Sequence, residues 1–164
     1  MKNAIYPGSF DPVTVGHLNI IRRAALIFDH LTVCVMVNAG KNPMFTLEER
    51  VDLIKRVTRD LPNVEVDSSS DLLAEYARGK GSCVIVKGLR AGSDFENEFQ
   101  MAMINHKINP DLDTMFLTSE HQYTYLSSSV VKELGRYDVD LSDFLPEEII
   151  PDFQKKIKTI HQGG

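Results

Sequence analysis

The feature that most constrains the fold of this chain is the uncharged, mainly apolar run LTVCVMV at residues 31–37. A strand with one face in water alternates apolar and polar side chains, whereas a strand covered on both faces carries apolar side chains almost continuously. The run therefore predicts a central strand of a sheet that has helices on both of its faces.

Strand-like and helix-like segments alternate along the rest of the chain. Other short apolar runs, expected to be strands, lie at residues 4–6, 63–66, 83–86 and 114–117. Apolar residues at helical spacing predict helices at residues 17–28, 46–60, 70–78, 94–107 and 127–137, and a last helix from about Pro146. Strands separated by helices imply right-handed crossovers in a parallel sheet. The sequence thus predicts an α/β fold: a single Rossmann-like domain over residues 1–164, with a five-stranded parallel sheet and helices on both faces.

Composition excludes several classes of partner. The formal net charge of −5 argues against a broad electrostatic interaction with nucleic acid. No apolar stretch approaches the ~20 residues of a membrane-spanning helix, and residues 1–6 lead directly into Pro7-Gly8 without room for a signal peptide. Cys34 and Cys83 lie inside strand-like runs without the spacing of a zinc site, and are expected to be buried thiols. We therefore expect a cytoplasmic protein without nucleic-acid or membrane partners.

The connection between the first strand and the first helix, residues 6–17, is long for such a turn and ends in Gly16-His17. Ligands of α/β sheets bind beyond the carboxyl ends of the strands, where loops lead into helix amino termini. Gly16 lets the backbone approach a ligand, and His17 can donate a ring N–H to a phosphate that also faces the helix dipole. We interpret this loop as an anion site. The alternative is that Gly16 merely turns the chain and His17 has no ligand.

Two further loops are expected at the same edge of the sheet. Residues 86–92 leave the fourth strand with two cations and two glycines. Residues 123–132 bring three serines to a helix start, where hydroxyls and free N–H groups can bind a phosphate, and Lys132 lies further along that helix. Each feature alone is compatible with an ordinary surface loop or helix cap. Their joint occurrence predicts a nucleotide pocket.

The same segments resemble the signatures of a known family. TVGH at residues 14–17 resembles the (H/T)xGH signature of nucleotidyltransferases, and SSSVVK at residues 127–132 resembles their carboxyl-terminal signature. The stretches YPGSFDP, PMFTLEER, GLRA with DFE, and SSS with VKE resemble bacterial phosphopantetheine adenylyltransferases in order and spacing, over nearly the whole chain. Lys87 and Asn97 depart from this pattern, since the family usually has arginine at the first position and often tyrosine at the second. Lysine keeps the charge but lacks the bidentate fork of arginine.

The resemblance implies transfer of the adenylyl group of ATP to 4′-phosphopantetheine, which gives dephospho-coenzyme A and pyrophosphate in the penultimate step of coenzyme A biosynthesis. It also implies Mg²⁺ bound with the ATP, a homohexamer, and coenzyme A as an inhibitor. Two alternatives remain open. One is a related nucleotidyltransferase with another phosphorylated acceptor, such as nicotinamide mononucleotide or glycerol phosphate, and the other is a non-catalytic ATP-sensing module.

Carried over position by position, the resemblance implies His17 as the catalytic residue and assigns no residue to a metal. The residues expected at ATP are Ser9, Phe10, His17, Gly88, Leu89, Arg90, Glu98, Tyr123, Thr124, Tyr125, Leu126, Ser127, Ser128 and Ser129. Those expected at phosphopantetheine are Ser9, Lys41, Leu73 and Lys87. Because the acceptor phosphate is already an anion at neutral pH, no general base is needed, and His17 would donate to the α-phosphate in the transition state. Its protonation state stays open, since the helix amino terminus favours the neutral ring and a bound triphosphate favours the charged one.

Overall fold

The structure, a computed structural model, describes residues 1–81, 84–91 and 94–163. Within these ranges, five parallel strands form one sheet in the order β3-β2-β1-β4-β5. The strands are β1 (Asn3–Gly8), β2 (His30–Met36), β3 (Val64–Ser69), β4 (Val84–Leu89) and β5 (Asp113–Thr118). The chain adds β2 and β3 on one side of β1 and then β4 and β5 on the other. The strand order therefore reverses between β1 and β4, the point at which α/β sheets form a ligand crevice.

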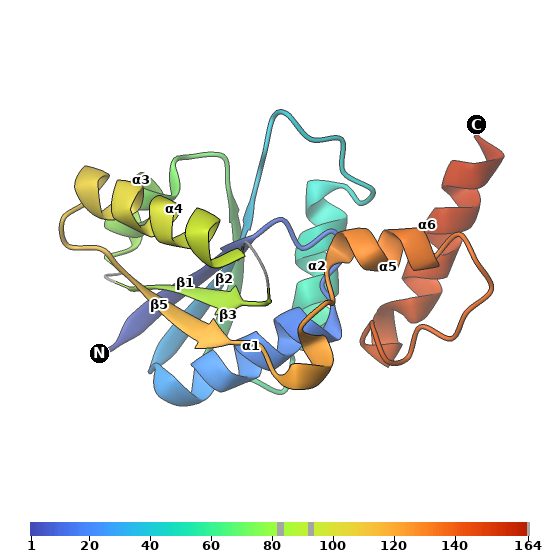
Figure 1. The fold of residues 1–164 in the computed structure, drawn as a ribbon, viewed down its shortest axis with the longest axis horizontal. Helices are drawn as coiled ribbons and strands as arrows, with labels where there is room; N and C mark the ends of the chain where they lie inside the picture. Colours follow the sequence, from blue (N-terminus) through green and yellow to red (C-terminus); the bar gives the residue numbers. More distant parts are fainter. Residues whose placement is uncertain (82–83, 92–93, 164) are drawn as a thin grey trace.

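Helices connect the strands and extend the chain beyond them. They are α1 (Val15–Ile27), α2 (Leu47–Val57), α3 (Leu73–Lys80), α4 (Asp94–Ile108), α5 (Ser128–Leu134) and α6 (Ile150–Gln162), with the short 3-10 helices η1 (His121–Tyr123) and η2 (Glu147–Ile149). Helices α3 and α4 lie over one face of the sheet and α1 lies against the other (Figure 1). In the part of the chain that the structure describes, no helix is long and apolar enough to cross a membrane.

Strand β2 shows why its apolar run is continuous. Val33 and Val35 are fully buried in the larger core, which also contains residues of α1 and α2. Cys34, between them, is fully buried on the opposite face in a smaller core with Ala74 and Ala77 of α3. Both faces of the strand are therefore covered, and the predicted Rossmann-like sheet is confirmed. Cys34 is a buried thiol as predicted, whereas Cys83 lies outside the described residues.

Strand β4 runs further than the sequence indicates. Gly88 and Leu89 were expected in a loop, but they pair with Leu117 and Thr118 of β5 and extend the strand to Leu89. Lys87 consequently lies on a strand as well. The prediction of a loop from residue 86 onward is therefore wrong, because pairing with β5 stabilises an extended backbone that the local sequence does not favour.

Two helix boundaries also differ from the prediction. Helix α3 begins at Leu73 without a side-chain cap, not at Ser70, because β3 stays paired with β2 as far as Ser69. Helix α5 covers Ser128–Leu134 and stops short of Tyr137. The next residue, Gly135, packs against α6, and a Cβ at this position would lie 2.7 Å from the ring of Phe153. Strand pairing therefore sets the first boundary, and close packing explains the glycine at the second.

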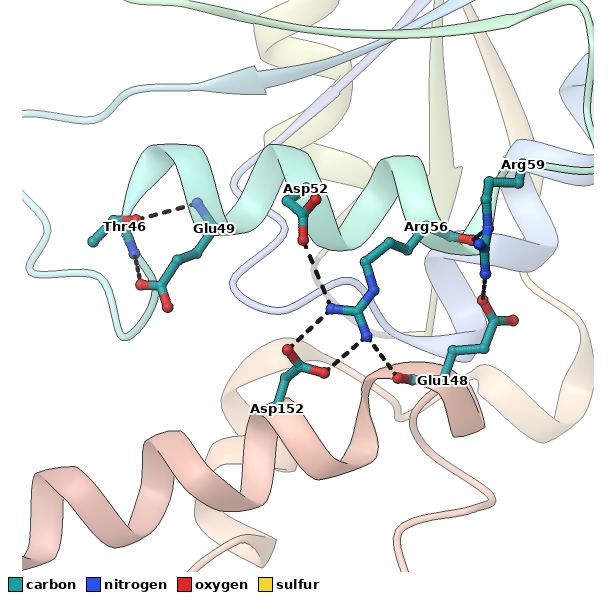
Figure 2. Close-up of polar contacts among 7 residues, drawn as sticks. All are labelled: Thr46, Glu49, Asp52, Arg56, Arg59, Glu148 and Asp152. Carbon is teal, nitrogen blue, oxygen red and sulfur yellow. Dashed lines mark hydrogen bonds and ion pairs between the residues drawn. The ribbon is translucent and has the colours of Figure 1, made fainter.

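Helix α6 packs on α2 through charged side chains (Figure 2). Arg56 of α2 donates to both carboxylate oxygens of Asp152 at 2.9 and 3.0 Å and to the carbonyl oxygen of Glu148 at 3.0 Å. At the other end of α2, Thr46 and Glu49 form a capping box. The contacts of Arg56 hold the carboxyl-terminal helix against α2, which begins just beyond the loop containing Lys41.

Candidate active site

A cleft of about 220 Å³ opens at the carboxyl ends of β1 and β4, where the strand order reverses. Its walls come from the loop after β1, the start of α1, the end of β4, one side chain of α4 and the segment that leads into α5. The three loops singled out in the sequence therefore meet in one place. They do so because parallel strands present their carboxyl ends at the same edge of a sheet.

His17 is fixed by a capping box at the start of α1. The backbone N–H of Thr14 donates to Nδ1 of His17 at 3.0 Å, and the backbone N–H of His17 donates to the Thr14 hydroxyl at 3.2 Å. A ring nitrogen that accepts a hydrogen bond carries no proton, so the neutral ring holds its proton on Nε2. The cap therefore leaves the ring with one N–H donor, on the nitrogen that the backbone does not use.

The surroundings of His17 favour the neutral ring. Burial, followed by the positive charges of Arg90 and Lys87, lowers the pKa of His17 from its ordinary value of 6.5 to about 3. The ring also packs edge-on against Phe10, with centroids 5.0 Å apart, and stays partly exposed toward the cleft. At neutral pH the residue is a neutral hydrogen-bond donor. This answers the question of protonation that the sequence leaves open for the ligand-free protein.

Phe10 holds the loop after β1 in an uncommon conformation. Its φ of 48° lies in the left-handed region, which a residue with a bulky side chain rarely adopts. The side chain is buried and packs edge-on against Tyr6 at 5.3 Å, and a Cβ at Gly8 would lie 3.0 Å from the Phe10 ring. Packing therefore maintains a strained backbone, as is common at binding sites, and brings Ser9 and Phe10 to the cleft.

The basic residues near the end of β4 already have partners. Lys87 Nζ lies 3.4 Å from Glu98 Oε1 of α4, and about a quarter of each side chain is exposed. Arg90 donates to the carbonyl oxygen of Leu126 at 2.9 Å. The first contact joins β4 to α4, and the second joins the β4 loop to the segment before α5. Two positive charges thus face the cleft in defined positions.

The three serines are partly structural. Ser127 Oγ accepts the N–H of Val130 at 3.2 Å and caps α5, while Ser128 Oγ donates to the carbonyl oxygen of Pro12 at 2.8 Å. Both residues line the cleft together with Ser129. The segment is therefore anchored to the loop after β1 while it presents backbone N–H groups and a hydroxyl at the start of a helix.

The cleft brings together most, but not all, of the residues predicted at the substrates. Those that line it are Ser9, Phe10, His17, Lys87, Gly88, Arg90, Glu98, Tyr123, Leu126, Ser127, Ser128 and Ser129. Of the remainder, Leu89, Thr124 and Tyr125 lie outside its lining, and Tyr125 is 83% exposed. Lys41 lines a second cavity of about 420 Å³, which adjoins the cleft at Ser9, and Leu73 packs against the smaller core.

The second cavity contains charged residues beyond those predicted at the substrates. Asp11 and Arg50 line it together with Lys41 and with Lys132, which ends the predicted serine segment. Arg50 had a signal that could have been noticed, because it shares the buried face of α2 with Leu53 and Ile54 at helical spacing. Asp11 stands in the YPGSFDP stretch of the family resemblance, but its role had no local signal, since its partners are distant in the sequence.

The described residues contain no group of three or more His, Cys, Asp or Glu side chains arranged to hold a metal ion. Magnesium at nucleotide sites is bound largely by phosphate oxygens and water, with one or two carboxylates from the protein. Glu98 brings a carboxylate to the cleft. The donor set therefore fits an ion that arrives with a nucleotide and does not require a preformed protein cage.

Comparison with known proteins places the chain among nucleotidyltransferases. A family model described as cytidylyltransferase-like matches residues 5–134. In structure, the chain resembles nicotinic acid mononucleotide adenylyltransferase from Plasmodium falciparum, complexed with NaAD, with a TM-score of 0.62 and 15% identity over 98% of this chain and 96% of that one. At this identity the likeness concerns the fold alone.

Curated relatives are much closer in sequence. Phosphopantetheine adenylyltransferase from Alkaliphilus metalliredigens is 54% identical over 156 residues, which cover 95% of this chain and 99% of the relative. The enzymes of that name from Caldanaerobacter subterraneus and Clostridium botulinum are 51% and 52% identical, over 96% of this chain and 99% and 96% of their own lengths. On these similarities, the chain belongs to the phosphopantetheine adenylyltransferase family.

Proposed function

We propose that the cleft transfers the adenylyl group of ATP to 4′-phosphopantetheine, forming dephospho-coenzyme A and releasing pyrophosphate. This is the penultimate step of coenzyme A biosynthesis. The observation that supports it best is the neutral ring of His17, fixed through Nδ1 in a cleft that also contains Lys87 and Arg90. The similarity to phosphopantetheine adenylyltransferases, over 95% and 96% of this chain, supports phosphopantetheine as the acceptor.

The reaction requires positioning and charge neutralisation more than a base. A phosphate oxygen of the acceptor attacks the α-phosphorus of ATP, the bond to the bridging oxygen breaks, and that oxygen leaves with pyrophosphate. His17 donates from Nε2 to an α-phosphate oxygen as negative charge grows there. Lys41 and Lys87 offset repulsion at the acceptor, while Arg90 and the serines at 127–129 bind the β- and γ-phosphates.

Magnesium belongs with the nucleotide in this proposal. It would neutralise charge on the β- and γ-phosphates, with phosphate oxygens, water and the Glu98 carboxylate as its ligands. In the structure the Glu98 carboxylate pairs with Lys87 at 3.4 Å. With both substrates bound, Lys87 would contact the acceptor phosphate and Glu98 would be available to the ion.

We further propose that residues 1–164 form one nucleotidyltransferase domain that assembles as a homohexamer in the cytoplasm. Helix α4 exposes large apolar side chains, a feature typical of protein interfaces: Phe95, Phe99, Met101, Met103 and Ile104. The free thiol of Cys34 suits a reducing compartment. Coenzyme A contains the adenylyl and pantetheine groups of both substrates, and we expect it to inhibit by occupying the cleft. A light-scattering mass near six times 18.5 kDa would support the assembly, whereas a monomer would contradict it.

Pyrophosphate release tests the proposed reaction. The protein is incubated with ATP and Mg²⁺ and one of two acceptors, 4′-phosphopantetheine or nicotinamide mononucleotide, and a third tube contains CTP with glycerol 3-phosphate. Release with phosphopantetheine, with dephospho-coenzyme A as product, is the expected result. Release with another acceptor alone would move the protein to a sister activity. If folded protein that binds ATP releases no pyrophosphate in any tube, it would be a nucleotide sensor.

A further inference from the structure

A buried carboxylate, that of Asp11, connects three segments of the site without contacting either substrate in the proposed reaction. The side chain of Asp11 is 8% exposed and accepts the backbone N–H groups of Met44 and Phe45, both at 2.9 Å. Its Oδ2 atom also lies 2.6 Å from Nζ of Lys132. Hydrogen bonds in which donor or acceptor is charged are short and strong, so this carboxylate holds its partners firmly.

Each segment that meets at Asp11 leads to a different part of the proposed site. Asp11 follows Ser9 and Phe10 directly in the loop after β1. Met44 and Phe45 end the segment that contains Lys41, on the acceptor side. Lys132 lies one helical turn beyond Ser128, on the helix that begins at the triphosphate-side serines. One carboxylate therefore sets the distance between the two sides.

Further contacts hold the loop after β1, one from α5 and one from α2. Ser128 Oγ donates to the carbonyl oxygen of Pro12 at 2.8 Å, which ties α5 to the residue after Asp11. Arg50 of α2 is buried and donates to the carbonyl oxygen of Ser9 at 3.1 Å. Among the described residues, Lys132 lines the second cavity and is not part of the cleft lining. Its ion pair is with Asp11, and this is the contact through which the lysine can act on the reaction.

We propose that Asp11 and Lys132 are a positioning pair that fixes the acceptor-side and triphosphate-side loops at the spacing required for in-line transfer. The inference rests on the proposed function. In-line displacement depends on reacting atoms about 3–3.5 Å apart, and a misplacement of about 1 Å can cost about 10²-fold in rate. Binding of each substrate alone depends much less on this spacing, because each is held by its own side of the cleft.

Lys132 offers the first test, because its side chain is 33% exposed and Asp11 keeps the N–H donors of Met44 and Phe45 when the lysine is removed. Lys132→Met keeps the aliphatic stem and should lower kcat by about tenfold or more, with the Kd for ATP within about threefold of wild type. Lys132→Arg restores the charge and should restore most of kcat. Lys158→Met, which removes an exposed lysine from α6, is the matched control and should match wild type.

A double-mutant cycle with Asp11→Asn separates positioning from direct contact with the nucleotide. If Lys132 acts through Asp11, the double variant should be no slower than the slower single variant. Additive losses in kcat, or a large loss of ATP affinity in Lys132→Met, would overturn the proposal in favour of a direct phosphate contact. A lower melting temperature with unchanged kcat and KM would overturn it in favour of a purely structural pair.

Amide hydrogen exchange provides a readout that does not depend on activity. The N–H groups of Met44 and Phe45 should exchange faster in Lys132→Met than in wild type, and unchanged exchange would contradict the proposal. This measurement also stands if Asp11→Asn does not fold. Absence of turnover in the wild-type protein would reject the proposed function, whereas normal wild-type turnover with an unaffected Lys132→Met would reject the positioning pair alone.

Discussion

Acid should destabilise this fold through His17. Its pKa in the folded protein is about 3, against 6.5 as the ordinary value for an unfolded chain. Below pH 6.5 the unfolded chain binds a proton that the folded chain does not, so stability present above that pH is lost as the pH falls toward 3. At pH 5 the loss is about 2 kcal/mol, from 1.36 kcal/mol for each of roughly 1.5 pH units. Because one edge of the ring is exposed to solvent in the cleft, about 2 kcal/mol is the upper value of this loss.

Urea unfolding at about pH 8 and about pH 5, at one fixed protein concentration, measures the effect. His17→Gln keeps a polar side chain that does not titrate, so wild type should lose up to about 2 kcal/mol more than this variant between the two pH values. His161→Gln removes an exposed imidazole from α6 and is the matched control, expected to follow wild type. Equal losses in wild type and His17→Gln would refute the argument. Nitrogen NMR of the ring should independently show Nδ1 without a proton.

Other contacts give further predictions, each measurable by chemical denaturation. Thr46→Ala removes the cap of α2 and should cost about 1 kcal/mol. Gly88→Ala places a Cβ 3.1 Å from Cγ1 of Ile20 and should cost about 1–3 kcal/mol. The guanidinium of Arg56 lowers the pKa of Asp152, so the stabilisation from this pair is present at neutral pH and is lost as the pH falls through that lowered pKa. In Asp152→Asn the free energy of unfolding should therefore fall less steeply as the pH is lowered.

The fold could be predicted because its main determinants are local. The continuous apolar run at residues 31–37 and the alternation of segment types follow directly from a sheet covered on both faces. The extent of β4 could not be predicted, because Lys87 and Gly88 are residues typical of loops and only the pairing with β5 shows that they are in a strand. Gly88 is better explained by the close approach of Ile20 from α1 than by a turn.

Part of the site could also be predicted from the sequence. That the three loops share one edge follows from a parallel sheet, and the cleft contains residues from each. The role of Asp11 was inaccessible, because its partners Met44 and Lys132 lie 33 and 121 residues away. The protonation state of His17 could not be predicted either. The helix amino terminus and a bound triphosphate have opposite effects on its pKa, and the sequence gives no distances from which to weigh them. The hydrogen bond from Thr14 to Nδ1 supplies the missing geometry.

The alkaline limb of the rate profile separates two roles for His17. An imidazolium donor would lose its charge as the pH rises through its pKa, so kcat/KM would fall above about pH 6.5. A neutral ring with its proton on Nε2 gives up no charge there. The value of kcat/KM for ATP, which reports the free enzyme, should therefore stay level from about pH 7 to about pH 9. A fall across that range, present in wild type and absent from His17→Gln, would mean that the reacting ring is charged despite its cap. If acid destabilisation were still observed, the ring would be neutral in the folded protein before substrate binds. The ring would then have to take up a proton when the triphosphate binds.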